Sequence, residues 1–274
     1  MLHEKIFLRD DDPTVTLTAY VADQRYEARP AMLVLPGGGY CYCSDREAEP
    51  IALAFMAKGY NCFVLDYSVE EKAKFPRPLV DAALAMRCIR RNAEKFNIDP
   101  ARVFAVGFSA GGHLCALLGS LWDAQVLYEE IPDLAAGEAR PTGTVLAYPV
   151  ISAHVRTHQV SFRRISGMAE PTLEDLLPYS IDDLISEKSA PIYVFHTATD
   201  NCVPVENSIA LMMALAKKNI PFAARIYPKG QHGFSLANRQ TWVGQPGCLI
   251  PDAESWVDDV AAWMETVPST EPLA

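Results

Sequence analysis

Residues 103–112 read VFAVGFSAGG, and this stretch decides the fold. Its first four residues form an apolar run typical of a buried strand, and an apolar helical pattern follows over 110–121. A sharp turn from strand to helix keeps a serine exposed, and it needs small residues two positions to either side. Gly107 and Gly111 meet this requirement. The stretch therefore predicts a turn that presents Ser109 at the carboxyl end of a strand.

Short apolar runs recur on both sides of this turn, and helical patterns separate them. Runs without polar alternation suit strands that are covered on both faces, as in a parallel sheet. The predicted strands are 31–35, 60–65, 103–106, 144–148, 192–195 and 222–227, and the predicted helices are 48–58, 79–96, 110–121, 205–218 and 253–266. This alternation predicts an α/β fold with a mostly parallel central sheet and helices on both faces.

Some segments depart from the alternation. Residues 14–21 alternate apolar and polar side chains and, with 5–8, predict an antiparallel hairpin at the edge of the sheet. Residues 122–142 and 151–190 contain prolines and are less periodic. We expect loops or short helices there, over the carboxyl edge of the sheet, where α/β folds bind ligands. One domain is expected over 1–274, with 151–190 as a lid or short insertion near the active site.

Composition excludes several classes of protein. The chain has 274 residues, of which 50% are hydrophobic and 21% charged, so it is not a disordered chain. The formal net charge is −10 and no basic cluster is present, so we expect no nucleic-acid partner. Residues 103–122 carry no charge and are long enough to cross a bilayer, but their glycines and the predicted turn favour a buried position. We expect no membrane partner, and a homo-oligomer stays open.

No pattern in the chain calls for a metal, an organic cofactor or a disulfide. Residues 1–13 contain no apolar run of signal-peptide length, so a cytoplasmic location is expected. The seven cysteines are odd in number and scattered, which favours free thiols. Cys41 and Cys43 lack a second Cys/His pair nearby, and the helically spaced His154 and His158 lack a third ligand.

Residues 35–40 read LPGGGY and follow the first strand of the predicted parallel sheet. Glycines let the backbone approach a ligand closely and present its N–H groups. A dinucleotide-binding loop needs the pattern G-x-G-x-x-G, but position 42 is tyrosine. We therefore predict that Gly38 and Gly39 donate to an oxyanion, with a purely structural turn as the alternative. The N–H of Ala110, at the start of the helix after the serine, is the predicted third donor.

A serine hydroxyl is a weak nucleophile unless a base activates it. His232 lies in a glycine-flanked loop, 229–234, after a predicted strand, and is the predicted base. A carboxylate must fix the tautomer of this base. Asp200 follows another predicted strand and is the expected partner, with Glu206 as the alternative. The other histidines are expected elsewhere: His3 at the terminus, His113 and His196 in the core, and His154 and His158 on a solvated face.

With these motifs the chain resembles the α/β-hydrolase esterases of the acetyl-esterase and acetylxylan-esterase-like branch, related to hormone-sensitive-lipase-type carboxylesterases. The resemblance covers about 14–266 and rests on LPGGGY (35–40), SDREAEP (44–50), DPARVFAVGFSAGGHL (99–114), HTATDNCVPVENS (196–208) and YPKGQHGF (227–234). It implies the α/β-hydrolase fold, with the triad order Ser109, Asp200, His232. It also implies Gly38, Gly39 and Ala110 as the oxyanion donors.

Two positions depart from this family. Pro36 stands where the family has a histidine before the glycine run. Phe108 stands where the hormone-sensitive-lipase relatives have an aspartate inside the nucleophile motif. No large cap domain is expected before residue 31. These features argue against a lipase.

We therefore expect a serine hydrolase that cleaves short-acyl carboxylic esters, acetylated sugars among them, through a Ser-His-Asp triad and an acyl-enzyme. Tyr40, Phe108 and Phe234 adjoin the predicted site residues and are predicted to line a narrow acyl pocket. The charges within 151–190 suit a polar alcohol portion; they are Arg156, Arg163, Arg164, Glu170, Glu174, Asp175, Asp182, Asp183, Glu187 and Lys188. Two alternatives stay open: an amide or peptide hydrolase with the same triad, and a catalytically inactive receptor for small molecules.

Overall fold

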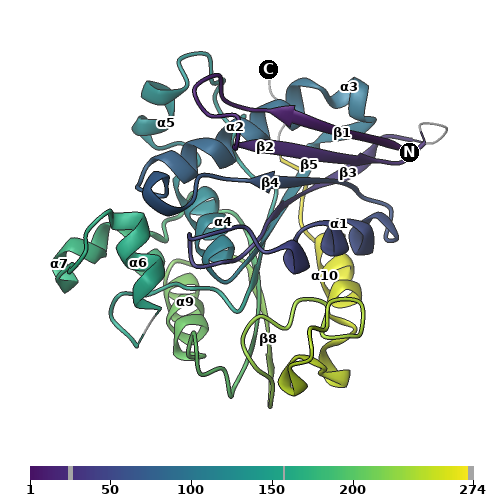
Figure 1. Ribbon diagram of the computed structural model, residues 1–274. Coiled ribbons are helices and arrows are strands. Elements are labelled where there is room, and N and C mark those ends of the chain that lie inside the picture. Colours follow the sequence, from purple (N-terminus) through teal and green to yellow (C-terminus); the bar gives the residue numbers. More distant parts are fainter. Residues whose placement is uncertain (24–26, 157, 271–274) are drawn as a thin grey trace.

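The computed structural model describes residues 1–23, 27–156 and 158–270, which form an eight-stranded sheet between layers of helices (Figure 1). The strand order is β1-β2-β4-β3-β5-β6-β7-β8. The strands are β1 (Leu2–Phe7), β2 (Thr16–Val21), β3 (Arg29–Leu35), β4 (Asn61–Asp66), β5 (Ile98–Phe108), β6 (Thr144–Ala147), β7 (Ile192–Thr197) and β8 (Phe222–Tyr227). The β1–β2 and β2–β4 pairs are antiparallel and the other pairs are parallel. This confirms the predicted mostly parallel sheet and its edge hairpin.

Helices cover both faces of the sheet (Figure 1). One face carries α1 (Glu49–Met56) and α10 (Trp256–Met264), and the other carries α2 (Arg77–Arg91), α4 (Ala110–Leu121) and α9 (Glu206–Lys217). Side chains alternate between the faces of a strand. In β3, Leu33 therefore packs with the layer of α2, α4 and α9, whereas Met32 and Val34 pack with the layer of α1 and α10. A strand that feeds two cores must be apolar throughout, which explains the unbroken apolar runs.

The bounds of two predicted helices differ in the structure. The helix expected over 79–96 divides at Asn92, where α2 ends and the short α3 (Ala93–Phe96) begins. The Asn92 side chain donates to the carbonyl of Cys88 at 2.8 Å, a local bond of the kind that competes with helical pairing. The helix expected over 253–266 begins only at Trp256, after a 3₁₀ turn.

The less periodic segments contain short helices, as expected. These are α5 (Gln125–Glu130), α6 (Gln159–Ser166), α7 (Leu173–Leu176) and α8 (Ile181–Leu184), with the 3₁₀ turn η3 (Leu177–Tyr179) between the last two. Elsewhere in the described chain, 3₁₀ turns besides the one before α10 are η1 (Asp45–Glu47), η2 (Glu70–Lys72) and η4 (Pro246–Cys248). At the start of α6, His158 approaches the glycine loop: a Cβ added at Gly39 would lie 3.3 Å from its Cε1. The 151–190 segment thus forms part of a wall at the carboxyl edge of the sheet. Its movement as a lid stays a prediction.

The charge-free stretch 103–122 is divided between β5, a turn and α4. Among the described residues, no helix combines the length and apolarity needed to cross a bilayer. All seven cysteines are free thiols.

Candidate active site

Ser109 occupies the turn between β5 and α4, with φ +53° and ψ −113°. This backbone conformation is rare for a residue with a side chain, and such strain clusters at functional sites. A Cβ at Gly107 would lie 2.1 Å from the carbonyl oxygen of Gly111, and one at Gly111 would lie 2.2 Å from that of Leu35. Neither position has room for a larger residue. The chain therefore forms the predicted strand–turn–helix, and as predicted the turn requires glycine on both sides of Ser109.

The three residues predicted as a triad form one chain of hydrogen bonds. Ser109 Oγ lies 2.7 Å from His232 Nε2, and His232 Nδ1 lies 2.7 Å from Asp200 Oδ2. An ionised carboxylate can only accept, so Nδ1 carries the ring proton and donates to Asp200. Nε2 of the neutral ring is then free to accept the hydroxyl proton of Ser109. The alternative carboxylate, Glu206, instead begins α9.

Asp200 is held as an ionised acceptor. Its side chain is fully buried, and Oδ1 accepts the N–H groups of Cys202 and Val203, both at 2.9 Å. Burial alone would raise the pKa of Asp200. Hydrogen bonds from His196 and His232 outweigh burial and hold this pKa well below its ordinary value. The carboxylate of Asp200 is therefore ionised at every pH at which His232 is neutral and able to accept a proton.

Three backbone N–H groups near Ser109 have no acceptor in the described part of the chain. Gly38 and Gly39 line the same cleft as Ser109 and have φ values of +128° and +66°. Ala110 is the first residue of α4, where N–H groups have no partner within the helix. No hydrogen bond between described residues uses these three N–H groups. The groups predicted as oxyanion donors are thus available to a ligand.

A buried carboxylate that the sequence analysis did not single out, Glu47, connects the two loops of the site. Its Oε2 accepts the N–H of Gly37 at 2.9 Å, and its Oε1 accepts the hydroxyl of Tyr148 at 2.6 Å. The Tyr148 oxygen in turn accepts the N–H of Ser235 at 3.0 Å, and its ring centroid lies 5.1 Å from that of His232. Glu47 and Tyr148 therefore hold the glycine loop and the histidine loop in register.

The cleft above Ser109 has a volume of about 390 Å³. His158, predicted on a solvated face, instead lines this cleft, and its Nδ1 lies 2.9 Å from Ser161 Oγ. Burial lowers the pKa of His158, and the nearby His232 lowers it further. The only sequence signal for His158 was its place in the segment expected near the site. Its spacing from His154 had no bearing, because His154 pairs with Asp183 instead.

Tyr40, Phe108 and Phe234, predicted to contact the substrate, do not line the cleft. All three are fully buried beneath it. Phe108 follows the alternation of β5 into the layer of α1 and α10, with its ring centroid 6.0 Å from that of Trp256. The ring of Phe234 packs 4.8 Å from that of Tyr148. Their predicted role is thus corrected to one of packing, because proximity to a site residue in the sequence does not by itself place a side chain in the cleft.

His113 and His196 are buried in the core, as expected. The Tyr40 hydroxyl donates to His113 Nδ1 at 2.9 Å, and His113 Nε2 donates to the carbonyl of Tyr179 at 2.8 Å. Burial lowers the pKa of His113 to about 4. This histidine is therefore neutral at physiological pH, and it ties the glycine loop to the 151–190 segment.

Comparisons with known proteins agree over most of the chain. The family model BD-FAE matches residues 17–153, and that of the dienelactone hydrolase family matches 175–266. Endo-1,4-beta-xylanase B of Butyrivibrio fibrisolvens is 40% identical over 80% of this chain and 34% of that protein. Acetylxylan esterase of Xylanibacter ruminicola is 29% identical over 85% of this chain and 46% of that protein. The chain spans less than half the length of either relative.

A solved structure is similar over almost the full length. The acetyl ester-xyloside bifunctional hydrolase from Caldicellulosiruptor lactoaceticus is 33% identical in sequence. The two structures match with a TM-score of 0.80 over 96% of each chain. This similarity, the family models and the strand–turn–helix at Ser109 point to one family. The chain belongs to the α/β-hydrolase esterases, within the BD-FAE family.

Proposed function

We propose that this protein is a serine esterase that cleaves short-acyl carboxylic esters through an acyl-enzyme. The observation that carries the proposal is the hydrogen-bond chain from Ser109 through His232 to the buried Asp200. Its tautomer leaves His232 Nε2 as an acceptor aimed at the serine hydroxyl. That is the arrangement an activated serine nucleophile requires.

In the first half of the reaction, His232 Nε2 takes the hydroxyl proton while Ser109 Oγ attacks the ester carbonyl carbon. The carbonyl oxygen becomes an oxyanion, and the N–H groups of Gly38, Gly39 and Ala110 are the donors available to it. Asp200 stabilises the imidazolium. His232 then gives its proton to the alcohol oxygen as the carbon–oxygen bond breaks, and the acyl group stays on Ser109.

In the second half, water replaces the alcohol. His232 takes one proton from water, and the hydroxide attacks the acyl carbon. The oxyanion forms again on the same N–H groups. It collapses to release the carboxylic acid, and His232 returns the proton to Ser109.

The lining of the cleft supports a short acyl group. Its side chains are mostly small or polar, with Val160 and Tyr42 as the large apolar exceptions: Gly38, Gly39, Cys41, Tyr42, Ser44, Arg46, Glu47, Ser109, His158, Val160, Cys202, His232, Gly233 and Gln245. A long acyl chain would desolvate these polar groups without a matching apolar surface. We therefore still expect selectivity for short acyl chains. The reason is the polar lining of the cleft rather than the aromatic residues predicted from the sequence.

Acetylated sugars are the proposed substrates. Two relatives support this choice, because one is named an acetylxylan esterase and the other an acetyl ester-xyloside hydrolase. A small acyl group on a polar alcohol also fits the polar cleft.

A series of p-nitrophenyl esters from acetate to octanoate tests the proposal. Each methylene that a pocket does not accommodate changes selectivity by about 1–3 kcal/mol, so acetate should exceed octanoate at least about 10-fold in kcat/KM. Ser109→Ala should lower kcat by about 10⁴–10⁶ while the fold survives. A maximum at eight carbons, or activity that persists in Ser109→Ala, would overturn the proposal.

Two further assays separate the alternative functions. A panel of anilides beside the esters distinguishes an amide or peptide hydrolase, which would cleave both. Labelling with a fluorophosphonate, which reacts with an activated serine, distinguishes a catalytically inactive receptor. We expect rapid labelling of the wild type, none of Ser109→Ala, and turnover of esters alone.

A further inference from the structure

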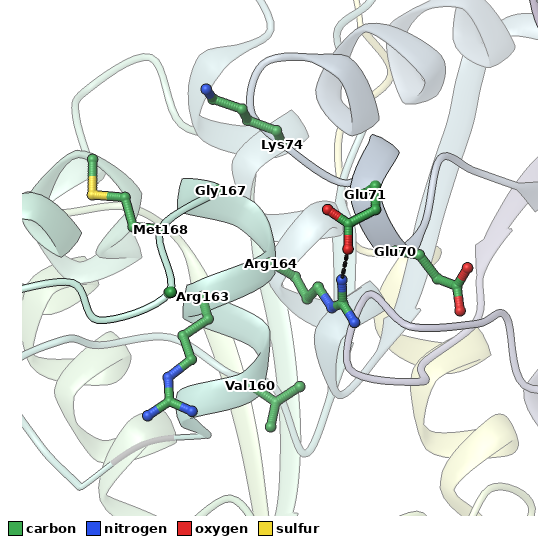
Figure 2. Close-up of a pocket in the computed structure, with 9 residues that line it drawn as sticks. Glu70, Glu71, Lys74, Val160, Arg163, Arg164, Gly167 and Met168 are labelled. Carbon is green, nitrogen blue, oxygen red and sulfur yellow. Dashed lines mark hydrogen bonds and ion pairs between the residues drawn. The ribbon is translucent and has the colours of Figure 1, made fainter.

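A second pocket, of about 510 Å³, lies beside the cleft, and Val160 lines both. Figure 2 shows that Arg163, Arg164 and Val160 extend from α6, while Glu70, Glu71 and Lys74 come from the segment at η2. The mechanism proposed above uses none of these residues. The pocket therefore needs its own explanation.

The walls of the second pocket are joined to each other and to the site. The Phe75 N–H donates to the carbonyl of Ile165 at 2.8 Å, which connects the η2 segment with α6. The Glu70 N–H donates to the carbonyl of Tyr40 at 2.7 Å, which connects the same segment with the glycine loop. At about 1.5 Å per residue, Gly167 at the far end lies about 10 Å from Val160 along α6. Since Val160 borders both hollows, a ligand in the cleft can extend past it into this pocket.

The pocket presents both hydrogen-bond donors and acceptors. Arg164 donates to Glu71 at 2.9 Å, and Figure 2 shows this pair crossing between the two walls. Arg163 and Lys74 form no ion pair with any described residue. Guanidinium and ammonium groups only donate, and carboxylates only accept, whereas a hydroxyl does both. A ligand rich in hydroxyl groups can therefore satisfy both kinds of group at once.

Other ligand classes fit the pocket less well. An acyl chain would desolvate five charged side chains, and it would offer no partner to Glu70, Lys74 and Arg163. An anion would face Glu70 and Glu71 as well as the three cationic side chains, whereas neutral hydroxyl groups can pair with both signs of charge. Val160 and Met168, which are 41% and 42% exposed, add apolar surface of the size that the carbon face of a sugar ring covers.

We propose that the second pocket binds the alcohol portion of the ester as a neutral sugar chain, while its acetyl group lies at Ser109. This inference rests on the proposed function, and it assigns the substrate's sugar to residues outside the catalytic cleft. Lys74 and Arg163 are the donors assigned to the sugar hydroxyls, because neither forms an ion pair with a described residue.

Kinetics on two substrates test this assignment. The variant Lys74→Ala/Arg163→Ala should raise KM for an acetylated xylo-oligosaccharide by about 10-fold or more, since hydrogen bonds to charged groups are lost. Its kcat on that substrate should stay close to the wild-type value. The kcat/KM for p-nitrophenyl acetate, which is too short to reach the pocket, should also stay close to wild type. Equal KM values for the variant and the wild type on the oligosaccharide would overturn the assignment.

A matched control and a binding assay keep the two proposals distinguishable. Lys217→Ala/Lys218→Ala removes the same charge from the exposed end of α9 and should change neither substrate's kinetics. Calorimetry of Ser109→Ala with an unacetylated xylo-oligosaccharide should show binding that Lys74→Ala/Arg163→Ala abolishes. No binding would overturn the sugar site. Binding without any ester hydrolysis by the wild type would keep the sugar site and overturn the proposed function.

Discussion

The floor beneath the cleft and the rim of the second pocket beside it are built in opposite ways. The floor consists of fully buried aromatic side chains, Phe108, Tyr148, Phe195, Phe234 and Trp256. The rim consists of the residues around the second pocket, Glu70, Glu71, Lys74, Arg163, Arg164 and Met168, most of them exposed. The aromatic rings of the floor pack against one another, whereas the long rim side chains line the second pocket and point in different directions (Figure 2).

The difference suits the proposed function, in which catalysis and specificity fall to different parts of the fold. Reacting groups must be held to within a fraction of an ångström, and a close-packed interior resists such displacements. The floor includes Tyr148, which contacts the ring of His232 and the carboxylate of Glu47. Rim side chains can adjust to hydroxyl groups at little cost. We therefore infer that the floor sets the rate and the rim selects the alcohol.

The largest effect is expected where the floor meets the chemistry. Asp200→Asn should lower kcat by about 10⁴, because an amide can donate to His232 Nδ1 and so favour the wrong tautomer. Glu206→Gln serves as the control and should retain activity, because its side chain lies on α9 rather than on the histidine. If Glu206→Gln is crippled and Asp200→Asn is not, the carboxylate is misassigned. Steady-state kinetics on p-nitrophenyl acetate measure both.

Asp200→Asn should also change how the free energy of unfolding depends on pH in acid. The pKa of Asp200 is lower in the folded protein than its ordinary value, so the unfolded chain binds a proton first as the pH falls. This carboxylate therefore stabilises the fold above about pH 4, and that contribution is lost as the pH drops towards the folded pKa. Urea unfolding at several pH values below 4 should show a shallower loss of stability for Asp200→Asn than for the wild type.

Stability distinguishes the floor from the rim directly. Phe108→Ala should lower the free energy of unfolding by about 3–5 kcal/mol, because it opens a cavity beneath the site. Met168→Ala on the rim should change it by no more than about 0.5 kcal/mol. Urea denaturation of both variants measures the contrast. A stable Phe108→Ala variant that accepts longer acyl chains would restore this residue as a substrate contact.

The smallest of these effects is expected at the link between the two loops. Glu47→Gln keeps the shape of the side chain but leaves one oxygen to accept from both Gly37 and Tyr148. A displacement of the glycine loop by about 1 Å should lower kcat about 10²-fold, with little change in KM for p-nitrophenyl acetate. Tyr148→Phe breaks the same link and should reproduce this split. Unchanged kcat in both variants would reduce Glu47 to a purely structural role.

The sequence by itself was sufficient for the sheet and for the candidate triad. Apolar runs and helical periods are local signals, and each follows from which faces of an element are covered. The turn at Ser109 was predictable because the exclusion at Gly107 acts within five residues of chain, although the backbone that excludes a side chain at Gly111 belongs to the distant Leu35 and Pro36. Asp200 and His232 were found in the same way, since each follows its own strand and parallel strands end at one edge.

Only the tertiary structure decided what surrounds those residues. Glu47 and Tyr148 are 101 positions apart, and no periodicity relates them. His158 reaches the cleft because α6 folds over Gly39, and Phe108 leaves it because β5 alternates between faces. The second pocket likewise joins the η2 segment to α6, about 90 residues later in the chain. Sequence motifs record the contacts of neighbours, whereas packing between distant segments depends on the complete fold.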